Sequence, residues 1–208
     1  MYVLREFQIN QIIDLFDQDQ ILIYPTDTLY GLLGNVFKEK LIKKVIKIKH
    51  RPFNKPFLIL ISEKFLNFFY FPTNLKFLLN YKCTIITKSC HDKLNKIYKK
   101  IFNTDKIAFR VPKKYYLYKI LKNLNYPLFA PSANISGFSP IKSVHEAKKY
   151  FLKDIRYFVK GNISKLPSTI LEVIDKNKIK IIRKGADLEK ILLECNKRGI
   201  KIQGANLT

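Results

Sequence analysis

The alternation of two apolar patterns constrains this chain more than any other feature of its sequence. Apolar runs of strand length, such as 21–24 and 57–61, alternate with segments such as 7–18 and 38–49, in which apolar residues recur every three or four positions. None of the runs approaches the ~18–20 residues that a membrane-spanning helix requires. Strands that alternate with amphipathic helices, without a polar linker between them, predict one α/β domain with a twisted sheet.

The rest of the chain continues this pattern, with one interruption. We predict further helices at 63–69, 72–80, 114–124, 143–151 and 187–197, and further strands at 83–87, 107–111, 128–130, 156–159, 169–174 and 179–183. Ser143 is expected to cap its helix, with Glu146 at the capping-box position, and Asp187 to cap the last helix. The lysine-rich segment 88–106 is weakly periodic and is predicted to be a mobile loop.

The charge balance is strongly basic but does not by itself identify a ligand. Lys and Arg number 39 against 16 Asp and Glu, which gives a formal net charge of +23. Such an excess normally points to nucleic acid, acidic lipid or phosphorylated ligands. However, only six of these cations are arginines, and the abundance of Lys, Ile and Asn matches A/T-rich codons. We therefore interpret most of the lysine charge as genome composition and treat the arginines as the informative cations.

Cysteine and histidine usage argues against a disulfide framework and a structural zinc site. The three cysteines form no CxxC pair, and the three histidines are dispersed without metal-ligand spacing. The first ten residues lack the basic and apolar regions of a signal peptide. We expect a soluble, cytoplasmic protein without a protein-held metal.

Small polar residues gather where two of the predicted strands end. In 24–31, a strand stops at Pro25, and two threonines and an aspartate precede a glycine turn. In 130–137, Ser132, Asn134 and Ser136 alternate and would present hydroxyl, amide and backbone N–H groups to an anion. Open α/β sheets bind ligands at the carboxyl ends of their strands, so both segments suit a small polar ligand. Capped turns without a ligand explain the same residues.

Two further segments bring in cations. Segment 49–56 holds Arg51 in a loop stiffened by two prolines. A rigidly held arginine suits a phosphate or carboxylate ligand. Cations in the last turn of a helix also complement the helix dipole, which explains the same residues without a ligand. Segment 167–186 would bring serine, threonine and an arginine from two neighbouring strands to one edge of the sheet. The common GxxxxGK[ST], GxGxxG, GxSxG and HExxH motifs do not occur. A nucleotide would therefore have to bind without a P-loop or a standard Rossmann turn.

Taken together, the segments resemble the Sua5/YciO/YrdC family of threonylcarbamoyl-adenylate synthases. The matching text, in order, is YPTDTLYGL at 24–32, KHRPFNKPF at 49–57, AFRVP at 108–112, APSANISG at 130–137 and STI…IIRKGA at 168–186. The resemblance corresponds to the short, single-domain type. It implies one domain over 1–208, with a motif-bearing core at about 7–186 and a C-terminal helix at about 187–198. It also implies a twisted mixed sheet flanked by helices and a concave, positively lined ligand cavity.

The reaction that this resemblance implies is the synthesis of L-threonylcarbamoyladenylate. A nucleotidyltransferase of this family condenses L-threonine, bicarbonate and ATP and releases pyrophosphate, and the product supplies the N6-threonylcarbamoyl (t6A) group of adenosine 37 in tRNA. Mg²⁺ is expected with ATP, held mainly by phosphates and water. The implied partners are proteins that transfer the threonylcarbamoyl group to tRNA, and weak binding of tRNA itself is a further expectation.

The resemblance also assigns roles to individual residues. The KxR and SxN elements, implied to be catalytic, fall on Lys49, Arg51, Ser132 and Asn134. The implied ATP-binding set comprises these four together with Lys55, Ser168 and Arg183. The implied threonine-binding set is Thr26, Thr28, Tyr30, Arg110 and Thr169. The chemistry agrees, because both steps of the reaction gather negative charge, which calls for fixed cations and hydrogen-bond donors rather than a nucleophilic side chain.

Two other functions remain open from the sequence. A non-catalytic RNA-binding module of the same fold is compatible with the charge, but the sequence shows no RRM-type run and no basic strand interleaved with aromatic residues. A paralogue acting on another carbamoylated substrate, as in hydrogenase-maturation carbamoyltransferases, would carry acylphosphatase and zinc-finger segments. This sequence has neither segment.

Overall fold

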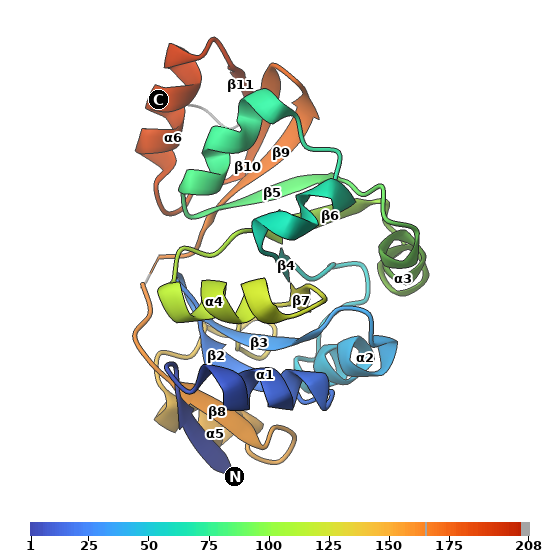
Figure 1. Cartoon of the computed structure of the whole chain (residues 1–208), viewed down its shortest axis with the longest axis vertical. Helices are drawn as coiled ribbons and strands as arrows, with labels where there is room; N and C mark the ends of the chain where they lie inside the picture. The colour runs from blue at the N-terminus through green and yellow to red at the C-terminus, as the bar shows by residue number, and fades with distance from the viewer. Residues whose placement is uncertain (165, 205–208) are drawn as a thin grey trace.

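A computed structural model describes residues 1–164 and 166–204, in which strands and helices alternate (Figure 1). The α-helices are α1 (Ile9–Asp17), α2 (Glu39–Ile48), α3 (Asp92–Phe102), α4 (Tyr115–Asn123), α5 (Val144–Phe151) and α6 (Leu188–Lys197), and the 3₁₀ helices are η1 (Glu63–Phe68) and η2 (Thr73–Asn80). The strands are β1 (Tyr2–Arg5), β2 (Leu22–Pro25), β3 (Tyr30–Asn35), β4 (Ile59–Leu60), β5 (Cys83–Lys88), β6 (Lys106–Arg110), β7 (Leu128–Phe129), β8 (Tyr157–Lys160), β9 (Thr169–Asp175), β10 (Lys178–Arg183) and β11 (Lys201–Gln203).

The strands pair into one mixed sheet. Over the described residues its order is β1-β8-β2-β3-β7-β4-β6-β5-β9-β10-β11. Strand β5, for example, runs parallel to β9 and antiparallel to β6. Figure 1 shows the N-terminus beside β8 at one end of the long axis, and α6 with β11 at the other end. The predicted mixed sheet flanked by helices is confirmed.

Apolar clusters cover both faces of the sheet. Strand β2 shows the alternation: Leu22 and Tyr24 pack with α1 and α4, whereas Ile23 packs into the cluster that buries one side of α2, α3, α5 and α6. Ile12 and Phe16 of α1 are fully buried, and burial of such side chains contributes about 1.5–3 kcal/mol each. The apolar stripe of each helix therefore decides which of its faces meets the sheet.

Most predicted elements lie close to their expected bounds, and one of the two predicted helix caps is present. Ser143 Oγ accepts a hydrogen bond from the N–H of Glu146 at 3.1 Å, while the Glu146 carboxylate accepts the N–H of Lys142 at 2.8 Å. Asp187 begins α6 with a φ of 58° and makes no capping hydrogen bond. Its carboxylate instead accepts the N–H of Lys82 at 2.9 Å, so the prediction for Asp187 is wrong.

Segment 88–106 is not the predicted mobile loop, because it contains helix α3. The buried side chains of α3 are Leu94, Ile97, Tyr98, Ile101 and Phe102. They follow the helical spacing of positions three and four apart. The Tyr98 hydroxyl also donates to the carbonyl oxygen of Phe57 at 2.8 Å, which ties α3 to the segment just before β4. The apolar stripe is confined to 92–102, between largely polar ends at 88–91 and 103–106, so the periodicity taken over the whole segment is weak.

Three strands were not expected from the sequence, namely β1, β3 and β11. The first and last are short and pair in parallel with β8 and β10. Strand β3 includes Gly31, so the glycine does not form a turn; the turn lies at 26–29, where the N–H of Thr26 donates to Leu29 O at 3.1 Å. Residues 165 and 205–208 of the predicted domain lie outside the described part. No helix within the described ranges is long and apolar enough to cross a membrane.

Candidate active site

A cavity of about 530 Å³ lies where the motif segments meet. Eight of the twelve predicted site residues line it, namely Thr26, Thr28, Tyr30, Arg51, Arg110, Ser132, Ser168 and Arg183. The sheet brings these distant segments together, because Gly31 forms a β-bridge with Ser132 and β5 pairs with β9. The other four predicted residues, Lys49, Lys55, Asn134 and Thr169, do not line the cavity.

The turn between β2 and β3 forms one wall of the cavity and is organised by a threonine. Thr26 Oγ1 donates to Leu29 O at 2.7 Å and accepts the N–H groups of Thr28 and Leu29, each at 3.2 Å. Arg110 reaches this turn from β6. Its Nη1 donates to Thr28 Oγ1 at 2.8 Å and its Nη2 to Thr26 Oγ1 at 3.3 Å. The two threonine hydroxyls are thereby fixed at the cavity wall.

Arg110 has a carboxylate partner within the protein. Its Nη2 lies 3.2 Å from Asp27 Oδ1, and both side chains are at most 5% exposed. Asp27 Oδ2 also accepts the N–H of Lys113 at 3.0 Å. The resemblance places Arg110 in the threonine-binding set, where it would pair with a carboxylate or phosphate of a ligand, and it gives Asp27 no role. One signal was present, since Asp27 is the single acidic residue in the first four motif segments.

Arg51 is the cation of the KxR element that reaches the cavity. Its Nε donates to Lys55 O at 2.9 Å and its Nη2 to Pro56 O at 3.2 Å. The guanidinium carbon lies 5.5 Å from the centre of the Phe57 ring, within the range of a cation–π interaction. The loop backbone and the ring therefore hold the guanidinium in place.

Lys49 and Asn134 lie behind the cavity wall. The Lys49 side chain is buried, and its Nζ donates to Ser132 O at 2.5 Å, Asn134 O at 2.7 Å and Asn134 Oδ1 at 3.2 Å. Burial, and next the charge of Arg51, lower the pKa of Lys49 to about 7. The expectation that Lys49 and Asn134 touch the ligand disagrees with this arrangement, because their polar atoms are bonded to the protein.

The hairpin of β9 and β10 supplies a third arginine. Arg183 Nη2 donates to Ser168 O at 2.7 Å, and Ser168 Oγ lies 2.9 Å from Thr84 Oγ1. Thr84 lines the cavity and was not predicted. Thr169, by contrast, is fully buried and donates from Oγ1 to Ala186 O at 2.7 Å. Successive residues of an extended chain face opposite sides, which is why Ser168 meets the cavity and Thr169 does not.

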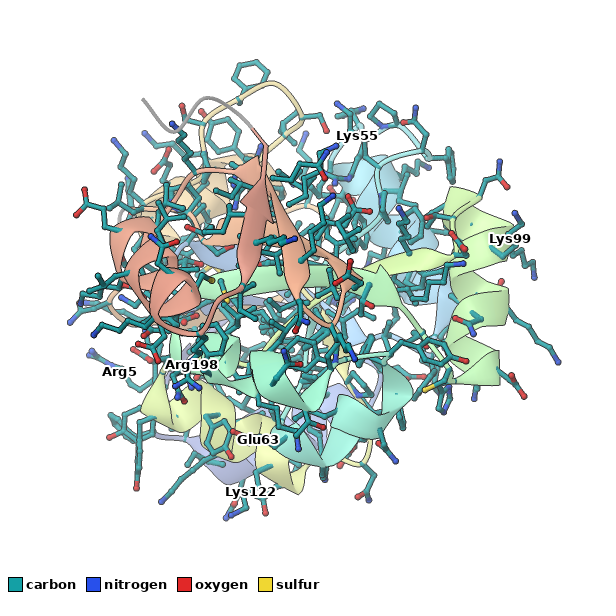
Figure 2. All side chains as sticks on the ribbon, turned by 90° about the horizontal axis from the view of Figure 1, so that it is seen from above. Arg5, Lys55, Glu63, Lys99, Lys122 and Arg198 are labelled. Carbon is teal, nitrogen blue, oxygen red and sulfur yellow. The ribbon has the colours of Figure 1, made fainter. Side chains whose placement is uncertain are left out.

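Two predicted residues remain at opposite extremes of exposure. Tyr30 is buried at the cavity, and its hydroxyl donates to Gly161 O at 2.9 Å. Burial raises the pKa of Tyr30, although the bond to Gly161 opposes this shift. Lys55 is exposed, and Figure 2 shows it at the periphery of the molecule. The predicted phosphate contact of Lys55 therefore has no support from its position.

The cavity combines a cationic rim with an apolar lining. Burial lowers the pKa of the guanidinium groups of Arg51, Arg110 and Arg183, yet arginine stays charged because its ordinary pKa is so high. Apolar lining residues that the sequence did not single out are Phe57, Leu58, Ile86, Ala108 and Ile170. Such a lining suits a planar ring, while the cations and hydroxyls suit phosphate and carboxylate groups.

The described lining of the site offers hydroxyl and guanidinium groups as its polar side chains. Among the described residues, no group of three or more His, Cys, Asp or Glu side chains is arranged to hold a metal ion. The described lining of the cavity contains no carboxylate, cysteine or histidine. Cys83 lies nearby in β5, but burial raises the pKa of its thiol to about 12. The arrangement can therefore bind and stabilise negative charge, and it leaves bond formation to the bound reactants.

Known proteins are similar to this chain in sequence. Residues 14–185 match the family model of Sua5, YciO and YrdC, which is described as telomere recombination. A Methanocaldococcus jannaschii protein, provisionally named threonylcarbamoyl-AMP synthase, is 34% identical over 209 residues, covering 94% of this chain and 96% of that protein. The threonylcarbamoyl-AMP synthase of Pseudoalteromonas translucida is 28% identical over 76% of this chain and 89% of its own length.

Solved structures share the fold. Sua5 of P. abyssi, crystallised with L-threonine, superposes with a TM-score of 0.83 at 23% identity, over 98% of this chain. This chain spans 63% of the length of that protein. E. coli YciO superposes with a TM-score of 0.73 at 20% identity, over 88% of this chain and 94% of its own. With the family model covering most of its length, this chain belongs to the Sua5/YciO/YrdC family.

Proposed function

We propose that this protein is an L-threonylcarbamoyladenylate synthase, a nucleotidyltransferase that joins L-threonine, bicarbonate and ATP. The observation that carries the proposal is the gathering of Arg51, Arg110 and Arg183 around one cavity whose described lining has no cysteine, histidine or carboxylate. Curated relatives of similar length are named for this activity. A site of this composition suits a reaction between bound substrates in which negative charge gathers on the reacting oxygens.

The proposed reaction has two steps. Bicarbonate loses hydroxide to give CO₂, and the threonine amine attacks the CO₂ carbon. The proton released from the amine joins that hydroxide as water, which leaves a carbamate. A carbamate oxygen then attacks the α-phosphorus of ATP, the bond to the bridging oxygen breaks, and pyrophosphate leaves. Fixed positive charge aimed at the reacting oxygens lowers the barrier of the second step, because negative charge is shared between attacking and leaving groups.

The cavity offers a distinct environment to each substrate. Arg51 and Arg183, with Ser132 and Ser168, form the side proposed for ATP. Thr26, Thr28 and Tyr30 form the side proposed for threonine, and Arg110 holds the two threonine hydroxyls in place from below. The apolar surface of Phe57 and its neighbours is available to the adenine ring. Substrates held side by side in this way react as if at very high local concentration.

Three further points belong to the proposal. Mg²⁺ arrives as part of MgATP, because the described cavity lining offers it no carboxylate and Asp27 is already paired with Arg110. The adenylate passes to proteins that transfer the threonylcarbamoyl group to adenosine 37 of tRNA. The protein acts in the cytoplasm, where ATP and tRNA are found together.

The test is mass spectrometry for the adenylate, with an assay of pyrophosphate, after incubation with MgATP, bicarbonate and L-threonine. We expect an adenylate that depends on threonine. Arg51→Ala is expected to lower its rate of formation by at least ~100-fold, because a preorganised charge near the reacting oxygens is lost. The unfolding midpoint should be unchanged, since this side chain is only half-buried.

Lys47→Ala is the matched control, because Lys47 is an exposed cation four residues before Arg51. It should react at the wild-type rate. If Arg51→Ala also reacts at that rate, the assignment of the cationic centre is wrong. If the wild-type protein forms no adenylate but retains RNA affinity, the non-catalytic RNA-binding alternative takes the place of the synthase.

A further inference from the structure

The lysine of the KxR element has all of its hydrogen-bonding capacity used by the protein. Lys49 is 1% exposed, and its ammonium group has three N–H donors. These face three oxygens of one loop: Ser132 O at 2.5 Å, Asn134 O at 2.7 Å and Asn134 Oδ1 at 3.2 Å. The carbonyl oxygen of Lys49 accepts the N–H of Ser136, at 2.8 Å, from the same loop. No donor of this side chain is left for a ligand.

The amide of Asn134 is committed in the same way. Its Oδ1 accepts from Lys49 and, at 2.6 Å, from the hydroxyl of Ser132, and its Nδ2 donates to Ile135 O and Phe138 O, both at 2.9 Å. Because an ammonium group can only donate, Lys49 fixes the amide with its oxygen inward. That oxygen in turn fixes the direction of the Ser132 O–H. Ser132 is the member of this group that lines the cavity.

The end of helix α2 explains why two cations so close in sequence have different partners. His50 has a φ of 48°, in the left-handed region that ends many helices. The N–H of Arg51 donates to Ile46 O at 3.1 Å and the N–H of His50 to Lys47 O at 3.1 Å, which is the Schellman pattern. The chain therefore turns sharply between Lys49, which contacts the 132–134 loop, and Arg51, which contacts Lys55 and Pro56.

We propose that Lys49 is a positioning residue rather than a phosphate ligand. It acts through Asn134 to hold the 132–134 loop and the Ser132 hydroxyl, whose proton is directed at Asn134 Oδ1 and whose oxygen stays at the cavity wall, while Arg51 supplies the cation that meets the substrate. The ligand in question is the ATP and carbamate of the proposed function, on which this inference rests. Of the KxR and SxN elements, Arg51 and Ser132 act on the substrate, and Lys49 and Asn134 hold Ser132 in place.

The first test needs no substrate. Unfolding midpoints are measured for the wild type, Lys49→Met, Asn134→Ala and the double variant, with Lys47→Met as the control for loss of an exposed lysine. Each single variant at the loop should lower the midpoint by about 5 °C or more, because each leaves buried polar atoms without partners. The double variant should lower it little further than the single ones. Additive effects would show that the two side chains are not coupled and would overturn the proposal.

The second test separates positioning from direct contact. In the adenylate assay, Lys49→Met should lower kcat/KM for ATP by about 10-fold or more in the wild-type background, but by less than about 3-fold when Ser132 is already alanine. An equal loss in both backgrounds would mean that Lys49 contacts the substrate itself. Lys49→Gln serves if the methionine variant does not fold. It keeps N–H donors without the charge, and should stay within about 5-fold of the wild-type kcat/KM.

A failure of this inference can be distinguished from a failure of the proposed function. If the wild type forms no adenylate, the synthase assignment fails, while the thermal cycle still decides whether Lys49 and Asn134 are coupled. If adenylate forms and Lys49→Gln is as impaired as Arg51→Ala, the charge of Lys49 acts on the substrate and the positioning role is wrong.

Discussion

At the scale of single residues, the structure separates cations that face the cavity from cations that hold the protein together. Residue type alone does not show this difference, since Lys49, Arg51 and Arg110 all stand in motif segments. Arg110 pairs with Asp27 from a different segment, and Lys49 pairs with the 132–134 loop. The partner of a buried charge is decided by which segments the fold places within about 4 Å of it.

The buried pair of Arg110 and Asp27 gives a prediction at this scale. Asp27→Asn keeps the shape of the side chain but leaves the guanidinium without its carboxylate, in a site where both groups are at most 5% exposed. We expect a loss of about 3–5 kcal/mol in the free energy of unfolding, measured with urea. Asp105→Asn is the control, because Asp105 pairs with Lys88 at 3.4 Å on an exposed surface, and its loss should cost at most about 1 kcal/mol. Equal losses in the two variants would contradict the prediction.

At the scale of elements, the predicted bounds are accurate where the apolar pattern is dense. Helix α3 is not predicted, although its apolar positions 94, 97, 98, 101 and 102 follow the helical period, because the stripe covers only part of the lysine-rich segment 88–106. In segment 24–31 the sequence predicts a turn at the glycine. Gly31 is instead a strand residue, where an added Cβ would lie 2.8 Å from the Leu33 side chain and 3.4 Å from Pro131 O. Its small size lets the 130–137 loop approach β3.

Helix α3 provides the prediction at this scale. Lys96→Pro should lower the free energy of unfolding by about 3 kcal/mol, because Lys96 is an exposed residue inside α3 and proline removes an N–H and clashes with the preceding turn. Lys96→Ala should change it by less than about 0.5 kcal/mol. Urea unfolding measures both. A loop at 88–106 would tolerate the two substitutions equally well.

At the scale of the whole molecule, the order of the strands in the sheet determines which residues come together in the site. Strand β8 lies between β1 and β2, and β9 beside β5, so segments more than eighty residues apart in sequence become neighbours. Long-range pairings of this kind cannot be read from local pattern. The lysines, in contrast, are spread around the surface, and Figure 2 shows Lys55, Lys99 and Lys122 at separate points of the periphery.

This distribution of charge predicts weak binding of tRNA that depends on salt. Binding carried by dispersed lysines should weaken by about 10-fold or more between 50 mM and 200 mM salt, because counterions are released from the phosphates. Arg51→Ala should bind tRNA as the wild type does, since its guanidinium is held at the cavity by the loop backbone. Filter binding or fluorescence anisotropy measures both quantities. A large loss of RNA affinity in Arg51→Ala would place RNA at the cavity instead.

The sequence by itself determined the α/β class, most of the elements, and eight of the residues that line the cavity. These features depend on local periodicity and on short motifs, which can be read directly from a single sequence. Only the tertiary structure decided that Lys49 and Asn134 lie behind the cavity wall and that Arg110 forms an ion pair with Asp27. It also decided that Thr169 faces the opposite side from Ser168. Those outcomes depend on which groups distant in sequence become neighbours once the strands have paired. They also depend on burial, because a buried polar atom is costly unless it has a hydrogen-bond or ion-pair partner within the protein.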